Sequence, residues 1–287
     1  MQTLKEILKR ANDGHWAVPH FNISNLEMLK AIIEVAREKK SPVLVGLSEG
    51  ERNFVGLPEI VALIQTIRKE TGLPIYLNAD HSGSVETARA AVDAGFDSVH
   101  IDLSKKPFEE NIAGTREIVE YAKQKNPLIS IEGEIGFFMT DSSKVYDKAV
   151  IIPTESLAKA EDAIRFVKET GVNRLAPVVG GIHGVSKSGA DHLDLGRILE
   201  IHKNVPEAML VLHGGSGDAP EDIKQAIANG IANIHISTDI RVAYLTALRE
   251  AVKSDEYVPY KLMASVVIAM KKVISDAIDL FGSAGRV

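Results

Sequence analysis

The sequence predicts a single (β/α)8 barrel (TIM barrel) with an added C-terminal helix, and three observations favour this fold class. Short runs of β-forming residues alternate with helical periods along the whole chain. The alternation repeats about eight times in about 250 residues, which matches such barrels in count and size. No linker, low-complexity block or run of like charges divides the chain. We therefore expect one domain over residues 1–287, in preference to an open doubly wound sheet, whose usual Gly-x-Gly-x-x-Gly turn is missing after the first strand.

The expected strands are short and largely apolar. They cover residues 17–21, 42–47, 74–77, 97–101, 128–131, 174–179, 208–212 and 232–237. Helices are expected where apolar residues recur at helical spacing, over 1–14, 25–36, 57–69, 84–94, 107–124, 155–169, 193–202, from 219, 238–251 and 257–281. About eighteen residues separate the strand region that ends in Glu132-Gly133-Glu134 from the helix near Thr154. This connection is long for a barrel loop, so it predicts a mobile lid.

Composition limits the classes of partner. The chain has 45% hydrophobic residues and a formal charge of −6, so it has no basic footprint for nucleic acid or an anionic membrane. It has no cysteine, so a transition metal would need histidine and carboxylate ligands. The first residues form a charged amphipathic pattern rather than a signal peptide, and no apolar run approaches the ~20 residues that span a bilayer. We expect a cytoplasmic protein.

Residues 210–217 read Leu-Val-Leu-His-Gly-Gly-Ser-Gly, an apolar strand that runs into a histidine and a glycine-rich turn. Glycines at Gly214, Gly215 and Gly217 allow backbone N–H groups to approach an anion closely, and Ser216 adds a hydroxyl donor. The helix that opens near Pro220 adds partial positive charge at its N-terminus. The pattern favours a phosphate site, although a plain flexible turn gives the same short motif.

Polar residues collect at the predicted strand ends, which converge at one face of a barrel. They are Ser48, Asp80, His81, Asp102, Glu132, Glu134, His183, His213 and His235. Three of these histidines, His81, His183 and His213, each follow a strand, and three imidazoles with an open position suit catalytic zinc or a similar divalent ion. His100 is expected in the core, and His15, His192 and His202 are expected away from the site.

Carboxylates accompany the candidate ligands. Asp80 directly precedes His81, so it is a candidate general acid or base that faces the substrate. Glu132 and Glu134 point the same way along one strand. They are candidates for an alternative ligand, a group that orients a ligand, or a proton carrier.

These motifs resemble the class II, metal-dependent fructose-bisphosphate and tagatose-bisphosphate aldolases. The matching segments run through the chain in family order: 21–22 with 25–27, 48–50, 80–81, 95–99 to Asp102, 107–111, 132–136, 183–184, 213–217 and 281–285. The resemblance implies a zinc-dependent aldolase that reversibly cleaves a ketose phosphate, such as fructose 1,6-bisphosphate, into dihydroxyacetone phosphate and an aldehyde through a metal-stabilised enediolate.

The resemblance also implies roles for individual residues. Zn²⁺ or another divalent metal is expected on His81, His183 and His213, with Glu132 as an occasional ligand and a monovalent cation as a further candidate. Asp80, Glu134 and Asp141 are the expected catalytic residues. The expected substrate and phosphate contacts are Asn22, Ser48, Gly184, Lys187, Gly214, Ser216, His235, Ser237 and Thr238. A homodimer or homotetramer is implied as well.

Three departures from the family pattern bear on substrate and mechanism. His235 stands where the family has an asparagine that contacts the ketose. Residues 258–261 read Val-Pro-Tyr-Lys where the family has an Asp-Pro-Arg whose arginine reaches the far phosphate in a neighbouring subunit, and Lys261 replaces it only in part. The lid, residues 137–150, holds no glutamate, so Asp141, Asp147 or Tyr146 are the candidate proton carriers there. A sugar-phosphate isomerase or epimerase with the same metal site, and a catalytically silent sugar-phosphate-binding protein, stay open as alternatives.

Overall fold

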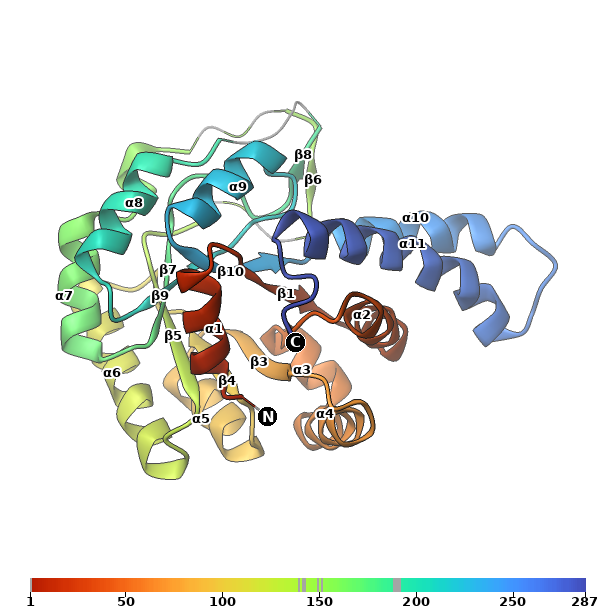
Figure 1. The fold of residues 1–287 in the computed structure, drawn as a ribbon, viewed down its shortest axis with the longest axis horizontal. Coiled ribbons are helices and arrows are strands. Elements are labelled where there is room, and N and C mark those ends of the chain that lie inside the picture. The colour runs from red at the N-terminus through yellow and green to blue at the C-terminus, as the bar shows by residue number, and fades with distance from the viewer. Residues whose placement is uncertain (1, 139, 141–142, 149, 151, 188–191) are drawn as a thin grey trace.

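A computed structural model describes residues 2–138, 140, 143–148, 150, 152–187 and 192–287 (Figure 1). Eight strands pair in parallel and close into a barrel, which confirms the predicted fold class. Around the barrel the strands are β1 (Val18–Asn22), β10 (Ile231–Ile236), β9 (Met209–Leu212), β7 (Arg174–Pro177), β5 (Ser130–Ile135), β4 (Ser98–Ile101), β3 (Ile75–Ser82) and β2 (Val43–Leu47).

The helices lie outside the barrel and alternate with its strands (Figure 1). They are α1 (Leu4–Asp13), α2 (Leu26–Lys39), α3 (Glu49–Val55), α4 (Leu57–Thr71), α5 (Val85–Ala94), α6 (Phe108–Lys125), the 3₁₀ turn η1 (Thr154–Ser156), α7 (Ala160–Thr170), α8 (Leu195–Asn204), α9 (Pro220–Ala228), α10 (Thr238–Ala251) and α11 (Pro259–Leu280). Asn25 and Ser84 cap α2 and α5 through their side chains, as their positions before apolar periods indicate. The short helix α3, which begins just after Ser48, was not predicted.

Helix α1 packs at the N-terminal end of the barrel, away from the predicted site. Its apolar face, which includes Ile7 and Leu8, packs with Trp16, Leu44 and Tyr76 in a separate cluster of buried side chains. This cluster closes the end of the barrel opposite the strand ends that carry the candidate residues.

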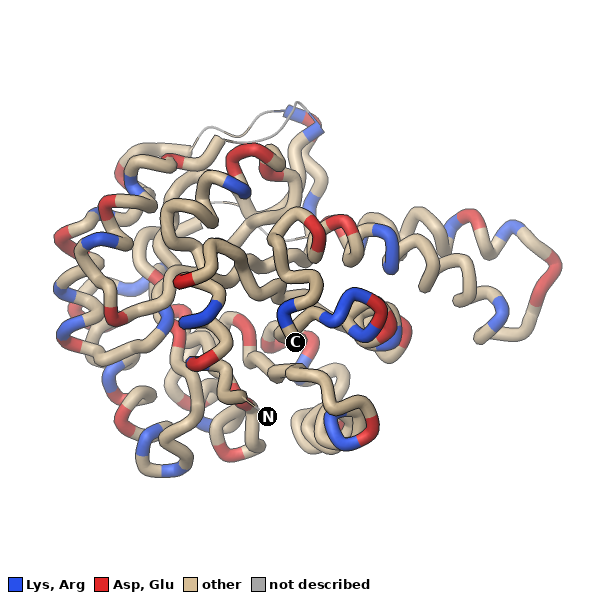
Figure 2. Tube along the Cα trace, in the orientation of Figure 1, with Lys and Arg blue, Asp and Glu red and all other residues tan. Residues whose placement is uncertain are grey.

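Helices α10 and α11 form a long antiparallel hairpin that projects from the barrel (Figure 1). Its root is held to α2, where Lys271 pairs with Glu34 and Glu38. Lys and Arg are interspersed with Asp and Glu over the helices (Figure 2). Among the described residues, no helix combines the length and apolar character needed to cross a membrane.

Strands β3 and β5 run further than predicted, to Ser82 and Ile135. The predicted strands ended at Leu77 and Ile131, where polar residues begin. The polar residues that follow, such as Asp80 and Glu134, are buried in the barrel and still belong to the strands, so a change to polar residues does not mark the strand end. The segment after β5 was predicted to be a lid. It includes the two-residue strand β6 (Val145–Tyr146), which pairs in parallel with β8 (Val185–Ser186).

Candidate metal centre and phosphate site

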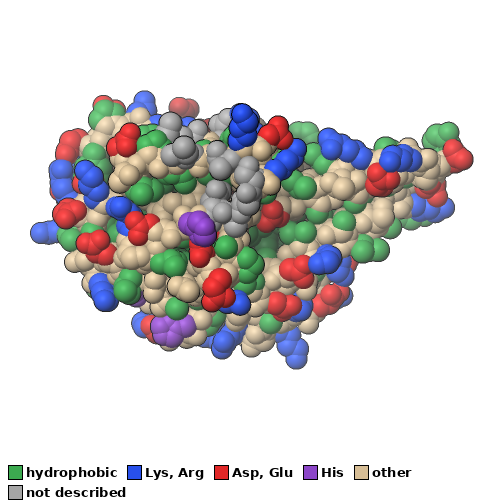
Figure 3. Space-filling model, turned by 90° about the horizontal axis from the view of Figure 1, so that it is seen from above, with side chains coloured by type: hydrophobic (Ala, Val, Ile, Leu, Met, Phe, Trp, Pro, Cys, Tyr) green, Lys and Arg blue, Asp and Glu red, His purple; other side chains and the backbone are tan. Residues whose placement is uncertain are grey.

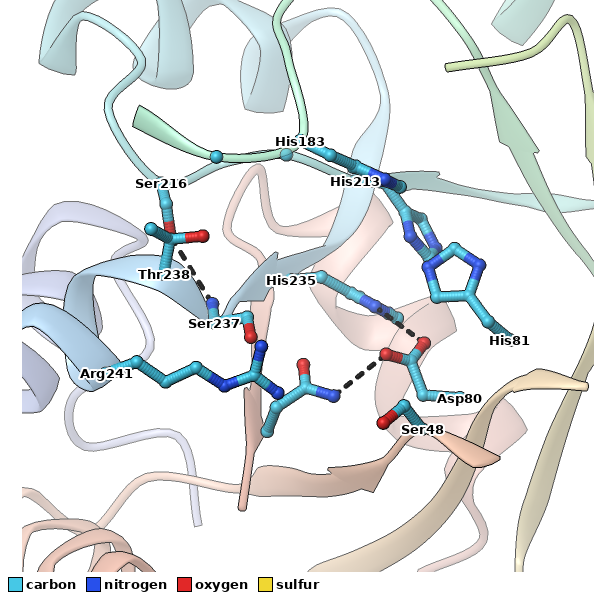
Figure 4. Close-up of a pocket in the computed structure, with 13 residues that line it drawn as sticks. Ser48, Asp80, His81, His183, His213, Ser216, His235, Ser237, Thr238 and Arg241 are labelled. Atoms are coloured by element: carbon cyan, nitrogen blue, oxygen red, sulfur yellow. Dashed lines mark hydrogen bonds and ion pairs between the residues drawn. The ribbon is translucent and has the colours of Figure 1, made fainter. Parts of the chain in front are cut away.

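Three imidazoles from different strand ends line one pocket at the C-terminal mouth of the barrel (Figure 4). His81 lies on β3, His183 follows β7, and His213 follows β9. The ring centroid of His81 lies 4.8 Å from that of His213 and 5.4 Å from that of His183. The fold therefore brings together the three histidines that the sequence suggested as metal ligands.

A local irregularity in β3 places Asp80 and His81 in the same pocket. Neighbouring strand residues normally point to opposite faces. Here the pairing of β3 with β4 shifts register between Ala79 and Ser82, and His81 adopts a left-handed φ of 45°. Such a conformation is uncommon for a residue with a Cβ and is typical of functional sites. As a result both Asp80 and His81 line the pocket.

Two carboxylates fix which nitrogen of the neighbouring histidine carries a proton. His81 Nδ1 lies 2.9 Å from Asp102 Oδ2, and His213 Nε2 lies 2.7 Å from Glu132 Oε1. A carboxylate accepts, so these nitrogens donate. Nδ1 of His213 is left with a free lone pair, and Nε2 of His81 is the nitrogen on which a metal would replace a proton. Carboxylate partners of this kind orient metal-binding histidines in known sites.

The third histidine is positioned by the segment after β5. The His183 ring stacks on Phe138 with centroids 3.9 Å apart, and its backbone N–H donates to Thr140 Oγ1 at 2.8 Å. Burial, followed by the nearby His81, lowers the pKa of His183 to about 3. Burial likewise lowers the pKa of His213 to about 3. Both rings are neutral at pH 7, which is the form that binds metals.

The pocket favours a cation. Burial by itself lowers the pKa of His81, but the charge of Asp80 and the hydrogen bond to Asp102 outweigh it and raise the pKa to about 10. The same group of carboxylates would favour a divalent ion in place of the proton. Two groups whose ligand atoms all lie within 4.8 Å of one another include His81: Asp80, His81, His100 and His213, and His81, His100, Asp102 and Glu134. Such sets of imidazole and carboxylate donors fit a divalent transition metal; His183, the third candidate ligand, belongs to neither group.

Asp80 is buried and ionised beside these imidazoles. Burial alone raises its pKa, but His81 and the nearby imidazoles of His100 and His235 hold the pKa well below the usual range. Its Oδ2 accepts a hydrogen bond from Asn22 Nδ2 at 2.9 Å, and its Oδ1 lies 3.4 Å from His235 Nδ1 (Figure 4).

The two glutamates of β5 have different surroundings. Glu132 lies between His213 and Arg174, whose Nη1 is 2.7 Å from Glu132 Oε2, and these groups hold its pKa well below normal against the effect of burial. Glu134 accepts a hydrogen bond from Ser104 at 3.1 Å. Burial and then the Asp102 charge raise the pKa of Glu134 to about 8, so this side chain is mostly protonated at pH 7.

The sequence reasoning missed two buried histidines. His100 is buried as expected, but its Nδ1 accepts from the His81 backbone N–H at 3.3 Å, so it belongs to the site. His20 stacks on His235 with centroids 3.6 Å apart, its partner in the β1–β10 register. A period-two signal was present, because His20 and His100 lie two residues before Asn22 and Asp102 and therefore face the same way.

The other side of the pocket has the character of an anion site. Its lining includes Asn22, Ser48, Gly184, Gly214, Ser216, His235, Ser237, Thr238 and Arg241 (Figure 4). Gly214 has a φ of 72°, and a Cβ there would lie 2.5 Å from the Ile182 carbonyl oxygen, so only glycine fits this turn. Ser216 Oγ accepts from the backbone N–H groups of Ser237 and Asp239, each at 3.3 Å. Arg241, which the sequence reasoning missed, contacts Glu51 and Ser143.

Some predicted residues lie elsewhere. Lys187 pairs with Asp147 at 2.7 Å, with both side chains exposed, and is not among the lining residues of the pocket. Asp141 lies outside the described residues. Lys261 pairs with Glu256 near the tip of the α10–α11 hairpin.

Comparison with known proteins agrees with the barrel and its histidine-lined mouth. The family described as fructose-bisphosphate aldolase class-II matches residues 2–286. The chain belongs to this family, whose members are metal-dependent aldolases.

Individual relatives match over nearly their whole length. A fructose-bisphosphate aldolase of Geobacillus stearothermophilus is 36% identical, over 99% of this chain and 98% of that protein. A fructose-bisphosphate aldolase of Staphylococcus aureus is 35% identical over the same shares. The crystal structure of the YdjI aldolase from Escherichia coli K12 superposes with a TM-score of 0.83 at 29% identity, over 99% of this chain and 98% of that one.

Proposed function

We propose that this protein is a zinc-dependent aldolase that reversibly cleaves a ketose phosphate into dihydroxyacetone phosphate and an aldehyde. The observation that carries the proposal is the convergence of three oriented imidazoles, an ionised aspartate and a glycine- and hydroxyl-rich anion site in one pocket. Fructose 1,6-bisphosphate is the first substrate to test, because two of the compared relatives are named for it.

His81, His183 and His213 would hold the metal, with Asp102 and Glu132 orienting two of the rings. When bound there, a divalent ion supplies Lewis acidity for the ketone of the substrate and for the negative charge left after cleavage. Glu132 is proposed as an occasional further ligand, and in this structure its oxygens lie beside His213 and Arg174.

Asp80 has the properties of the base in cleavage. It is ionised, and Asn22 holds its carboxylate in the pocket beside His81. We assign to Asp80 the removal of the proton from the C4 hydroxyl as the C3–C4 bond breaks and the aldehyde forms. In the synthetic direction the same carboxyl returns that proton.

Cleavage leaves an electron pair that must take up a proton at C3. Glu134 is a candidate donor, because its pKa of about 8 keeps the carboxyl protonated at neutral pH. Asp141 in the lid is the other candidate. The phosphate of the dihydroxyacetone phosphate half would bind to backbone and hydroxyl donors at Gly184, Gly214, Ser216, Ser237 and Thr238, next to the start of α10.

The decisive experiment is a retro-aldol assay on zinc-loaded protein with fructose 1,6-bisphosphate and ketose 1-phosphates, in which released dihydroxyacetone phosphate is measured. We expect turnover that a chelator abolishes and zinc restores, and a loss of at least about 100-fold in kcat for Asp80→Asn, within the range for loss of an acid–base group. Turnover unaffected by the chelator would contradict the proposal. Ketose–aldose exchange without cleavage would indicate an isomerase, and binding without any turnover a silent sugar-phosphate-binding protein.

We also propose a homodimer or homotetramer that uses the α10–α11 hairpin. Large apolar side chains are exposed there, among them Leu245, Tyr257, Tyr260 and Ile268. Figure 3 shows hydrophobic side chains along this projection. Size-exclusion chromatography with light scattering measures the mass of the assembly in solution. A species of 31.1 kDa, the mass of one chain, would contradict this assembly.

A further inference from the structure

Arg52, on the short helix α3, is buried, with 4% of its surface exposed, and it was not among the predicted site residues. Its Nη1 donates to the backbone carbonyls of Leu47 and Asp80, at 2.7 and 2.9 Å, and its Nη2 donates to Ser82 Oγ at 3.1 Å. Within the described part of the chain, no carboxylate forms an ion pair with it. Since buried charges are normally paired, these neutral acceptors indicate a role other than charge pairing.

The three acceptors of Arg52 surround the irregular part of β3. The register of β3 with β2 ends at the pair of Leu47 and Ala79, and its register with β4 resumes only at Ser82. The peptide that joins Asp80 to His81 lies in this gap. Arg52 therefore spans the interruption in the strand and ties it to the end of β2.

Buried side chains bond both ends of the peptide between Asp80 and His81. Its carbonyl accepts from Arg52 Nη1, and its N–H donates to His100 Nδ1 at 3.3 Å. The orientation of this peptide plane sets ψ of Asp80 and φ of His81. The φ of His81 is 45°, a left-handed value that steric contacts disfavour for a residue with a Cβ. The two hydrogen bonds therefore hold His81 in a conformation that it would otherwise rarely adopt.

This conformation brings together the two groups that the proposed function needs. Asp80 is the proposed base and His81 a proposed metal ligand, and both line the same pocket (Figure 4). In a regular strand, neighbouring side chains point to opposite faces. Rotation of the peptide toward regular strand geometry would therefore take one of the two side chains out of the pocket.

We propose that Arg52 is a positioning residue, which holds the peptide between Asp80 and His81 and thereby places the base and the metal ligand in one pocket. Arg52 is absent from the lining of that pocket, so it acts through the backbone and not by contact with the substrate. This inference rests on the proposed function. Loss of Arg52 then weakens metal binding and slows cleavage together, because one peptide carries both groups.

The test compares Arg52→Met with Arg68→Met, a matched control at the other end of the same strand. Arg68 on α4 donates from Nε to the carbonyl of Ile75 at 2.6 Å and pairs with Asp97. Both variants lose an arginine bond to a β3 carbonyl, but only Arg52 bonds the peptide at the site. For Arg52→Met we expect zinc affinity to fall by about 10- to 100-fold, the usual effect of losing a hydrogen bond from a charged group. Competition with a chromophoric chelator measures this affinity.

The control should separate a general loss of stability from a loss at the site. Arg68→Met should bind zinc within about 2-fold of the wild type, even where it is less stable, because effects at distant positions are nearly independent. Loading with Co²⁺ gives a second readout, since its visible absorption depends on the geometry of its ligands. Arg52→Met should change that spectrum and Arg68→Met should not. At saturating zinc, kcat of Arg52→Met should fall by about 10- to 100-fold, as expected for a displaced catalytic group.

Arg52→Lys covers the case in which Arg52→Met does not fold, because it keeps the buried charge. Its stem is one atom shorter and it lacks the planar fork, so it cannot reach all three acceptors, and we expect zinc binding at least about 10-fold weaker. If no ketose phosphate is cleaved but the Arg52 variants alone bind zinc more weakly, the aldolase proposal fails and the role of Arg52 stands. Wild-type zinc affinity in a folded Arg52 variant, or an equal loss in Arg68→Met, overturns the inference, as does a wild-type chain that binds neither metal.

Discussion

The ion pair between Arg174 and Glu132 gives the sharpest prediction about stability. Arg174 is fully buried inside the barrel, and its guanidinium lies 2.7 Å from Glu132 Oε2. It also donates to Asn233 Oδ1 and Asn78 Oδ1, each at 3.1 Å, and it contacts Ser98. Arg174→Met keeps an unbranched stem but leaves Glu132 as a buried carboxylate without its cation.

Removal of one member of a buried ion pair costs about 3–5 kcal/mol, because the remaining charge has lost its partner and cannot reach water. We expect a loss of this size in the unfolding free energy of Arg174→Met at pH 7. The double variant Arg174→Met with Glu132→Gln removes the charge as well, so it should recover more than half of that loss.

The loss should depend on pH with a definite sign. In the wild type the pKa of Glu132 is held below its unfolded value, so the pair contributes stability above that value, near 4.3, and loses it as the pH falls. Without Arg174 the pKa of Glu132 rises and the carboxyl takes up a proton more readily. The difference between variant and wild type should therefore shrink from pH 7 to pH 5.

Urea unfolding measures these values, with fluorescence of Trp16, the only tryptophan and a buried one, as the probe. A loss below about 1 kcal/mol for Arg174→Met, the size of an ordinary substitution, would refute the reasoning. So would a double variant that is as unstable as the single one.

Three further predictions concern the same barrel mouth. Asp102→Asn removes the carboxylate acceptor that orients His81, so it should weaken zinc binding about 10- to 100-fold. Competition with a chromophoric chelator measures this affinity, and an unchanged value would argue against the orienting role of Asp102. Burial raises the pKa of Glu134 to about 8, so only the folded state holds this proton between pH values of about 4.3 and about 8. The unfolding free energy of the metal-free chain should therefore fall over this range and level off above it, and Glu134→Gln should flatten the fall. A Cβ on Gly46 would overlap the His20 ring, so Gly46→Ala should cost about 1–3 kcal/mol in denaturant unfolding, whereas Gly50→Ala, with open space around it, should stay within about 0.5 kcal/mol.

The sequence by itself determined the order of strands and helices and the family. Alternating apolar runs and helical periods predict a barrel because each strand and helix buries one face. The buried positions therefore recur at regular spacing, and this spacing can be read directly from the sequence. It also placed Asp80, His81, His183 and His213 near strand ends, and the barrel closure then brings them to one pocket. The limits of β3 and β5 were wrong, because inward-facing Asp80 and Glu134 read as loop residues in a pattern of hydrophobicity.

Only the tertiary structure decided how the polar residues share the interior. The pairing of Arg174 with Glu132, the stack of His20 on His235, and the contact of His100 with His81 join strands that are far apart in sequence. No local pattern encodes these contacts, since they depend on strand register around a closed barrel. The bulge at His81 likewise lets the side chains of two neighbouring residues, Asp80 and His81, point into the same pocket. The protonated nitrogens of His81 and His213 are set by carboxylates on other strands or on the loops that follow them.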